Sequence, residues 1–377
     1  MHQPKIIVSS VGTSVLTNPI DRGNPAEKSW FGLMNQTANY SKKQLQQHAE
    51  AQSMVQQLIQ RAQQKLQQAD VKTIRRLSAE LNGIYGIYDN QLDQRGQDQH
   101  ILIRTDTAQG HAAAHLLEKY LRSQGIQQII IPELDGFSTQ DTVSFNQGIE
   151  SMLMALDFLK DRMHSHRISF NLVGGFKSMQ AYLNTLGMFY AHEIVYIFEG
   201  SGSEMIRIPR LPIQVDYRAI DTKLFALMAV GEIPYDQHTA TIAEALVTRV
   251  GDEITLSNWG QLIWNQVKQD QLSGDLLEFE YLTYQPSFNK DYQKATPAQR
   301  VQLQQTLAKV NYLLSRNRGD LNVLKQDSSL QYDVYTNKKG IGHFRLDNSS
   351  GWRISCTKQG DKLSLRRFGP HEINDNP

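Results

Sequence analysis

A lysine and two glycines lie together in the segment VGGFKS, residues 173–178, and are suited to holding a phosphate group. Gly174 and Gly175 let backbone N–H groups approach an anion closely, and Lys177 supplies a full positive charge. An apolar run at residues 168–173 precedes this point and a helical pattern follows it, which predicts a strand, a tight turn and a helix N-terminus. The partial positive charge at the start of that helix would add to the attraction for an anion.

A second segment of similar type, VGTS at residues 11–14, follows the apolar run at residues 5–8. Here Gly12 is followed by the hydroxyls of Thr13 and Ser14. Two such loops at the carboxyl ends of two strands indicate a doubly wound sheet whose crevice binds a phosphate-bearing ligand. Each loop alone also fits a plain strand-to-helix turn, in which glycine provides the geometry and serine caps the helix.

Common nucleotide fingerprints are missing from both loops. Neither has the Gly-x-Gly-x-x-Gly pattern of dinucleotide sites or the Gly-x-x-x-x-Gly-Lys-Ser/Thr pattern of P-loops, so NAD and ATP are not favoured as ligands. The whole chain carries 39 basic and 38 acidic residues, a formal net charge of +1, which argues against a globally basic nucleic-acid binder. Any site for nucleic acid must therefore be local.

A local excess of base does occur near the end of the chain, between residues 338 and 372. The basic residues there are Lys338, Lys339, Arg345, Arg353, Lys358, Lys362, Arg366 and Arg367, against Asp347, Asp361 and Glu372. Such an excess is what a protein needs to bind a phosphate backbone.

Cysteine, histidine and hydropathy patterns exclude several other classes of protein. The single cysteine, Cys356, excludes an intrachain disulfide framework and a cysteine-rich zinc module. His111 and His115 could share a helix face as metal ligands, but no further ligands cluster with them, so we expect no metal. No apolar run approaches the ~18 residues of a membrane span, and a signal peptide is not evident, so we expect a cytoplasmic protein without membrane contact.

Strand-like runs alternate with helical patterns in the first half of the chain, which predicts a parallel sheet. The predicted strands lie at residues 5–8, 100–104, 128–132 and 167–171, and the helices at residues 111–124 and 144–161. Residues 39–68 are rich in glutamine, but their apolar residues recur at near-helical spacing. We therefore expect residues 36–88 to form a helical insertion.

The last hundred residues predict a small α+β domain. Residues 276–282 alternate like a strand, and Thr296 with Pro297 begins a helix that runs to about residue 318. Three strand-like pieces follow and predict an antiparallel meander, at residues 343–346, 352–356 and 363–368. Residues 216–275 are expected to form a helical connector, with a helix capped by Ser257 or Asn258.

Residues 1–215 resemble a CARF domain, the sensor module of CRISPR-associated effectors. The resemblance rests on both glycine loops together with GMFY at residues 187–190, EIVYIFE at residues 193–199 and IRIPRLPI at residues 206–213. It implies a Rossmann-like α/β domain that forms a homodimer and binds a cyclic oligoadenylate, usually cyclic tetra-adenylate, across the two-fold axis. No other cofactor is implied.

The CARF resemblance also implies roles for individual residues. The ligand site would be lined by Gly12, Thr13, Ser14, Gly174, Gly175 and Lys177. Some relatives cleave their ligand slowly with the serine and lysine of these motifs, which here are Ser14 and Lys177. An isologous dimer presenting two copies of one cationic loop matches the charge and pseudo-two-fold shape of a cyclic tetranucleotide.

We expect residues 276–377 to form one domain. About residues 276–374 of it resemble the RelE family of toxin ribonucleases. The order of elements, GWRI at residues 351–354 and FGPH at residues 368–371 carry this resemblance. It implies metal-independent cleavage of messenger RNA on the ribosome, with the ribose 2′-hydroxyl as nucleophile. Such a reaction needs a base for the 2′-proton, cations for the phosphorane and an acid for the leaving oxygen.

Matching the strands to that family assigns candidate catalytic residues. Arg353 would be the main cation at the phosphate, with His343 and Arg345 on the same face of the preceding strand. His371 would be the general acid, with Arg367 as a substitute. A solvated basic face on a structural meander is the alternative interpretation of these residues.

The sequence therefore predicts an endoribonuclease of CRISPR defence that cyclic tetra-adenylate activates. Two alternatives remain. The protein could be a ring nuclease that degrades cyclic tetra-adenylate without cutting messenger RNA, or a ligand-controlled regulator that binds RNA or DNA and cuts neither.

Overall fold

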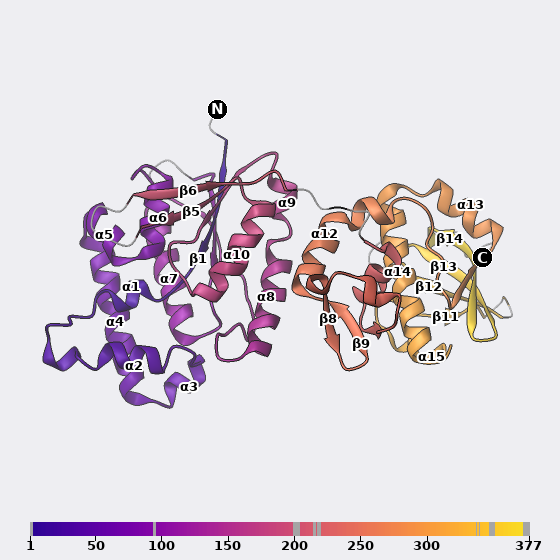
Figure 1. Cartoon of the computed structure of the whole chain (residues 1–377), viewed down its shortest axis with the longest axis horizontal. Helices are drawn as coiled ribbons and strands as arrows, with labels where there is room; N and C mark the ends of the chain where they lie inside the picture. Colours follow the sequence, from indigo (N-terminus) through magenta and orange to yellow (C-terminus); the bar gives the residue numbers. More distant parts are fainter. Residues whose placement is uncertain are drawn as a thin grey trace. The chain divides into compact units, whose positions relative to one another are not determined.

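The computed structural model of the chain divides into two compact units, residues 1–214 and 215–377 (Figure 1). Each unit has its own hydrophobic core, and among the described residues the first unit contains one sheet and the second unit two. The structure describes residues 3–92, 96–198, 204–213, 216, 220–336, 338, 340–346 and 351–371. Within these residues, no helix is both long and apolar enough to cross a lipid bilayer.

Six described strands form the sheet of the first unit, in the order β3-β2-β1-β4-β5-β6. They are β1 (Lys5–Ser10), β2 (Gln99–Ile103), β3 (Gln128–Ile130), β4 (Arg167–Asn171), β5 (Glu193–Ile197) and β6 (Met205–Pro209). Neighbouring strands are parallel except for β6, which pairs with β5 in the antiparallel sense. The predicted α/β unit with a parallel sheet is confirmed, and its strand order is compatible with a Rossmann-like fold.

Helices cover both faces of this sheet. In Figure 1, α4 (Ala49–Gln68), α6 (Ala79–Ile87) and α7 (Ala108–Ser123) lie on one side, and α8 (Thr142–Leu156) and α10 (Lys177–Tyr190) on the other. The glutamine-rich segment is helical as predicted, because α4 buries one apolar face against α7 and against α1 (Ser14–Thr17). The predicted insertion, residues 36–88, also contains α3 (Lys42–Gln46) and α5 (Val71–Leu77), and α2 (Trp30–Gln36) directly precedes it.

The strand order places the two glycine loops side by side. In this sheet β1 and β4 are neighbours, and the chain leaves β1 toward one edge and β4 toward the other. The loops that follow them therefore open at the topological switch point of the sheet, where α/β proteins bind ligands.

A five-stranded sheet forms the second unit, in the order β10-β14-β13-β12-β11. Its strands are β10 (Leu282–Tyr284), β11 (Asp333–Val334), β12 (Ile341–Arg345), β13 (Arg353–Gln359) and β14 (Lys362–Gly369). The antiparallel meander is confirmed for β12, β13 and β14. The ladder between β13 and β14 shifts register between Ser355 and Cys356, so that Arg366 is an additional residue in β14. The expected helix is α14 (Pro297–Arg316), which Thr296 caps together with Gln299.

The predicted strand at residues 276–282 is wrong, and only β10 (Leu282–Tyr284) pairs with β14. The reason lies in the side chains of α14. The backbone N–H of Leu277 donates to Oε1 of Gln304 at 2.8 Å, and that of Tyr281 donates to Oδ1 of Asn311 at 2.9 Å. The segment is thus held by helix side chains, although its alternation of apolar and polar residues resembles that of a strand.

Residues 216–275, which we expected to connect two domains, share the core of the second unit. Phe225 of α11 (Thr222–Met228) and Trp264 of α12 (Asn258–Leu272) are buried in the same cluster as Phe344 of β12. A small sheet, β7-β9-β8, lies in the same segment, with β7 (Ile233–Pro234), β8 (Val247–Val250) and β9 (Glu253–Leu256). Ser257 caps α12 as predicted.

We expect Gln304→Leu to destabilise the second unit by about 2–5 kcal/mol. The fully buried amide of Gln304 bonds the Leu277 N–H and the carbonyls of Leu272 and Asp275, and each buried group left unpaired costs about 1–3 kcal/mol. Urea unfolding followed by tryptophan fluorescence measures the change. Gln305→Leu, at an exposed position on the same helix, is the control and should change stability by less than about 0.5 kcal/mol.

The stability of the first unit should fall as the pH falls below about 6.5. Complete burial lowers the pKa of His100 in β2 to about 3, so the unfolded chain binds a proton on this imidazole that the folded chain excludes. The free energy of unfolding is unaffected by this proton above pH 6.5 and is lowered by about 2 kcal/mol at pH 5. Hydrogen exchange of the β2 amides measures this loss of stability. It should occur in the parent protein and in the control variant His164→Gln, which changes an exposed histidine. It should be absent in His100→Gln.

Candidate functional site

The loops after β1 and β4 are in direct contact. A Cβ atom added to Gly12 would lie 2.8 Å from the backbone nitrogen of Gly175. The Ser10 hydroxyl donates to the Gly174 carbonyl, which also accepts from Nε2 of Gln180 at 2.7 Å. Gly175 has φ of 97°, a conformation that favours glycine. The structure thus brings together the two segments that the sequence singled out.

A buried carboxylate that the sequence reasoning missed lies between these loops. Glu80, in the first turn of α6, has 0% exposure. Its Oε1 accepts from the Gly12 N–H at 2.8 Å, and its Oε2 accepts from the hydroxyls of Ser14 at 2.8 Å and Ser78 at 2.6 Å. No described basic residue forms an ion pair with it. The signal that could have found it is a serine helix cap, Ser78, followed by an acid in the first turn of the helix.

The packing of Glu80 requires a glycine at position 174. A Cβ atom on Gly174 would lie 2.1 Å from Oε1 of Glu80, which is far inside van der Waals contact. The Gly12 N–H, expected to face a phosphate, is instead bonded to the carboxylate. The loop after β1 therefore offers an anion less than its sequence suggested.

The start of α10 remains open for an anion. Lys177 is its first residue and is exposed, and Phe176 provides no side-chain cap. The first N–H groups of a helix have no partner within the helix, and they carry its partial positive charge. Thr13 is half-buried, and its carbonyl accepts from the N–H groups of Leu16 and Thr17. Of the two glycine loops, the one after β4 thus provides the positive charge.

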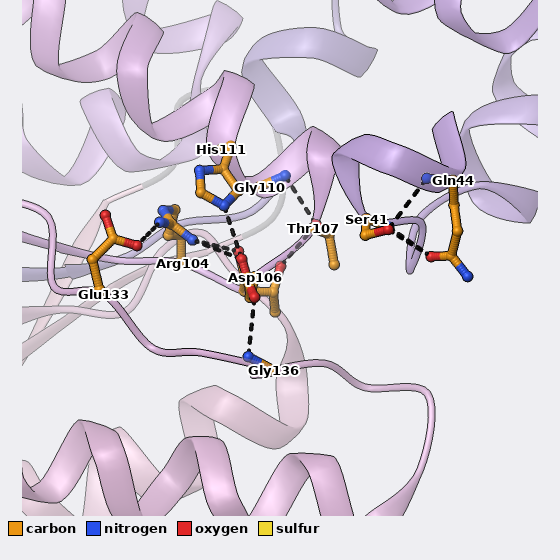
Figure 2. A network of polar contacts seen from close by, with 10 residues as sticks. Ser41, Gln44, Arg104, Asp106, Thr107, Gly110, His111, Glu133 and Gly136 are labelled. Atoms are coloured by element: carbon orange, nitrogen blue, oxygen red, sulfur yellow. Dashed lines mark hydrogen bonds and ion pairs between the residues drawn. The ribbon is translucent and has the colours of Figure 1, made fainter. Parts of the chain in front are cut away.

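A third loop at the same edge of the sheet, after β2, holds a network of charged groups (Figure 2). Asp106 accepts from Nε2 of His111 at 2.9 Å and from the N–H of Gly136 at 3.0 Å, and the buried Arg104 binds Glu133 at 2.9 Å. Burial lowers the pKa of His111 despite Asp106, so its ring is neutral at pH 7.

His115, the other histidine considered as a metal ligand, pairs instead with Glu118 at 3.2 Å. The described residues include no group of three or more potential metal ligands. The His111 network therefore acts here as a tie between two loops, because Asp106 bridges the start of α7 to the loop that follows β3.

Four of the five candidate residues of the second unit share one face of its sheet. In the strand register, Arg345 lies directly opposite Arg353, and His343 lies opposite Ser355, which lies opposite Arg367. Side chains that are directly opposite, or two apart on one strand, point to the same side. The other side of the sheet is buried in the core.

Arg345 and Arg353 form a cross-strand pair of like charges, which is destabilising unless something compensates. Neither guanidinium forms an ion pair with a described residue, and Arg353 donates to the carbonyl of Trp352 at 3.2 Å. Burial and the neighbouring Arg345 lower the pKa of Arg353. The pair is therefore predisposed to bind an anion.

An aromatic residue that the sequence reasoning missed stacks on His343. The ring of Tyr335 lies 4.3 Å from that of His343, with 21° between their planes. Burial, and then Arg353, lower the pKa of His343, so its imidazole is neutral at pH 7. Its Nδ1 and the hydroxyl oxygen of Ser355, both buried, have no hydrogen-bond partner among the described residues. This polar row continues the surface of the arginine pair.

Arg367 and His371 differ from the other candidates. Arg367 forms an ion pair at 2.7 Å with Asp291 of α13 (Pro286–Lys294), which also accepts from the Phe368 N–H. This arginine is thus committed to fastening β14 to α13. His371 is exposed, and it is close enough to His343 to contribute to that residue's lowered pKa. Lys339, Asp347 and Glu372, counted in the basic segment, lie outside the described residues.

Gly174→Ala should destabilise the first unit by about 1–3 kcal/mol, because the new methyl group would overlap the Glu80 carboxylate. We expect a thermal midpoint several degrees lower in differential scanning calorimetry. The control is Gly32→Ala in α2, where no atom lies within 4 Å of the added methyl group and the midpoint should stay the same or rise. An unchanged midpoint for Gly174→Ala would mean that Glu80 is not held against this loop.

Comparison with known proteins bears on the first unit. Residues 75–211 match the family model described as CRISPR-associated protein (Cas_APE2256). No curated protein matches the chain. The matched segment contains Glu80, Gly174, Gly175 and Lys177, and it leaves out Ser14 and the second unit. The match associates the protein with CRISPR systems.

Proposed function

We propose that the protein is a CRISPR-defence endoribonuclease whose first unit senses a cyclic oligoadenylate, with cyclic tetra-adenylate as the activator. The second unit would then cleave messenger RNA on the ribosome without a metal ion. The observation that carries the proposal is the cross-strand pair of Arg345 and Arg353, which no described acidic residue neutralises. Such a pair fits a phosphodiester, which supplies the missing negative charge.

Ligand sensing is supported by three features of the first unit. The match to a CRISPR-associated family covers most of its sheet, and the strand order places the topological switch point, where α/β sheets bind ligands, between β1 and β4. Lys177 and the open start of α10 place positive charge beside that switch point. A two-fold dimer would present two such charges to a ring with four phosphates. Ser14 and Lys177 are also the residues that slow ring cleavage would use.

The basic face has the groups that RNA cleavage through the 2′-hydroxyl requires. The neutral His343 is suited to accept the 2′-proton, and Arg345 and Arg353 would stabilise the phosphorane. The 2′-oxygen would bond to phosphorus as the bond to the 5′-oxygen breaks, and His371 would donate a proton to that leaving oxygen. Tyr335 adds a ring on which a base could stack.

Control by the ligand has a modest energetic requirement. A hundredfold activation needs the ligand to favour the active arrangement by about 2.7 kcal/mol. A few charge-assisted hydrogen bonds between phosphates and lysine-bearing loops are of that size. The sensor therefore needs only a small difference in contacts between its two arrangements.

Arg353→Ala should lower messenger cleavage by about 10²–10³-fold, because it removes half of the cationic pair that faces the phosphorane. Purified protein would be added to a translation extract with and without cyclic tetra-adenylate, and new 5′ ends on a reporter messenger mapped by primer extension. Lys358→Ala is the matched control, since it removes one exposed positive charge from the same strand outside the pair. Its cleavage should stay within about threefold of the parent.

Several results would contradict this function. Intact messenger together with loss of cyclic tetra-adenylate would make the protein a ring nuclease. Ligand-dependent RNA or DNA binding without any cleavage would make it a regulator. Cleavage that persists after ribosomes are removed would retain the ribonuclease and exclude the ribosome as a required partner.

A further inference from the structure

The hydrogen bonds of the Ser14 hydroxyl leave it with one role toward a ligand. A hydroxyl has one hydrogen to donate and two lone pairs with which to accept. Ser14 donates its hydrogen to Oε2 of Glu80 at 2.8 Å and accepts from the Ala79 N–H at 3.0 Å. One lone pair remains, and the half-buried side chain leaves it within reach of solvent. Toward a ligand, Ser14 is thus an acceptor of a hydrogen bond and not a donor.

Glu80 fixes this direction. An ionised carboxylate can only accept hydrogen bonds. The other two partners of the carboxylate are donors as well. The Gly12 N–H can only donate, and the Ser78 hydroxyl, which accepts from the Leu81 N–H at 3.2 Å, donates its own hydrogen to Glu80. The direction of every bond around the carboxylate is therefore set by groups inside the protein, before any ligand binds.

Phosphate and ribose differ in what they offer such a serine. The oxygens of a phosphodiester only accept hydrogen bonds, so a phosphate facing Ser14 would find no donor. A ribose 2′-hydroxyl can donate and fits the remaining lone pair. We propose that Glu80 is a positioning residue that makes Ser14 an acceptor for a ribose 2′-hydroxyl, and that this pair selects ribose over deoxyribose in the ligand.

The inference rests on the proposed function, since the ribose belongs to the cyclic oligoadenylate. It adds to that function a division of labour within the crevice. The loop after β4, with Lys177 and the start of α10, attracts the phosphates. The loop after β1, with Ser14 and Glu80, reads the sugar. A purely structural Glu80, which only ties α6 to the loop after β1, would affect the binding of every ligand equally.

The test compares the full-length protein's affinity for cyclic tetra-adenylate and for its 2′-deoxy counterpart by isothermal titration calorimetry. We expect the parent protein to prefer the ribose form by about 10–100-fold, as sites built to bond a hydroxyl reject the analogue that lacks it. In Glu80→Gln, the oxygen of the amide can still accept from Gly12, so its nitrogen donates to Ser14 and releases the serine hydrogen. The preference should then fall to within about threefold.

Two further variants complete the design. Ser14→Ala should lose the preference in the same way and tests the pair even if Glu80→Gln fails to fold. Glu150→Gln, an exposed glutamate on α8, is the matched control and should keep the parent ratio. Because each protein is compared on the same two rings, any effect of deoxyribose on the shape of the ring cancels.

The outcomes are separable. If the parent protein binds neither ring, the proposed function fails. If the parent shows no preference for ribose, or if Glu80→Gln and Ser14→Ala weaken both rings equally and keep the ratio, the sensor function stands and the role of Glu80 in reading ribose is wrong.

Discussion

One buried carboxylate holds the carboxyl edge of the first unit together. Moving a charge out of water costs several kcal/mol unless hydrogen bonds replace its hydration, and Glu80 receives three of them. Its donors come from the loop after β1 and from the cap of its own helix, and Gly174 of the loop after β4 packs against it. Neither loop can move far without leaving this carboxylate exposed to water or short of hydrogen-bond donors, so Glu80 keeps the two loops in place.

The two units handle charge in opposite ways. In the first, a buried acid uses up hydrogen-bond donors that would otherwise face an anion. In the second, Arg345 and Arg353 repel each other across a strand pair and are left unneutralised by the described residues. Proteins that break a local rule of stability in this way commonly do so at functional sites. The positive charge of Arg345 and Arg353 is therefore available to attract a phosphate. In the first unit, Glu80 already occupies the Gly12 N–H and the Ser14 hydroxyl, which could otherwise bind an anion.

The sequence was a good guide wherever the signal is local. Glycines and hydroxyls after apolar runs located both loops, and the Thr296 cap located α14, because these signals involve residues that are close together in the chain. The Ser78 cap marks Glu80 as an acid in the first turn of a helix, but no local signal shows its bond to Ser14, which lies 66 positions away in the sequence. The wrong strand prediction at residues 276–282 also results from contacts between distant parts of the sequence. The segment does alternate apolar and polar residues, but Gln304 and Asn311 of α14 accept hydrogen bonds from its N–H groups. Residues 216–275 show which of their own faces are apolar. Their pattern could not show which core those faces would join, because apolar periodicity carries no information about the packing partner.

The additional residue in β14 limits how the second unit can vary. Its core side chains, Leu363, Leu365 and Phe368, are spaced by two and then by three positions, and Arg366 takes up the difference. A single insertion or deletion between Arg353 and Ser355 would turn the cationic face toward the core, because side chains on a strand alternate. The turn at residues 360–361 is exposed, but its backbone lies close to Gly319, where an added Cβ atom would be 2.5 Å from the Asp361 carbonyl oxygen. The spacing on either side of the bulge should therefore stay constant among related chains.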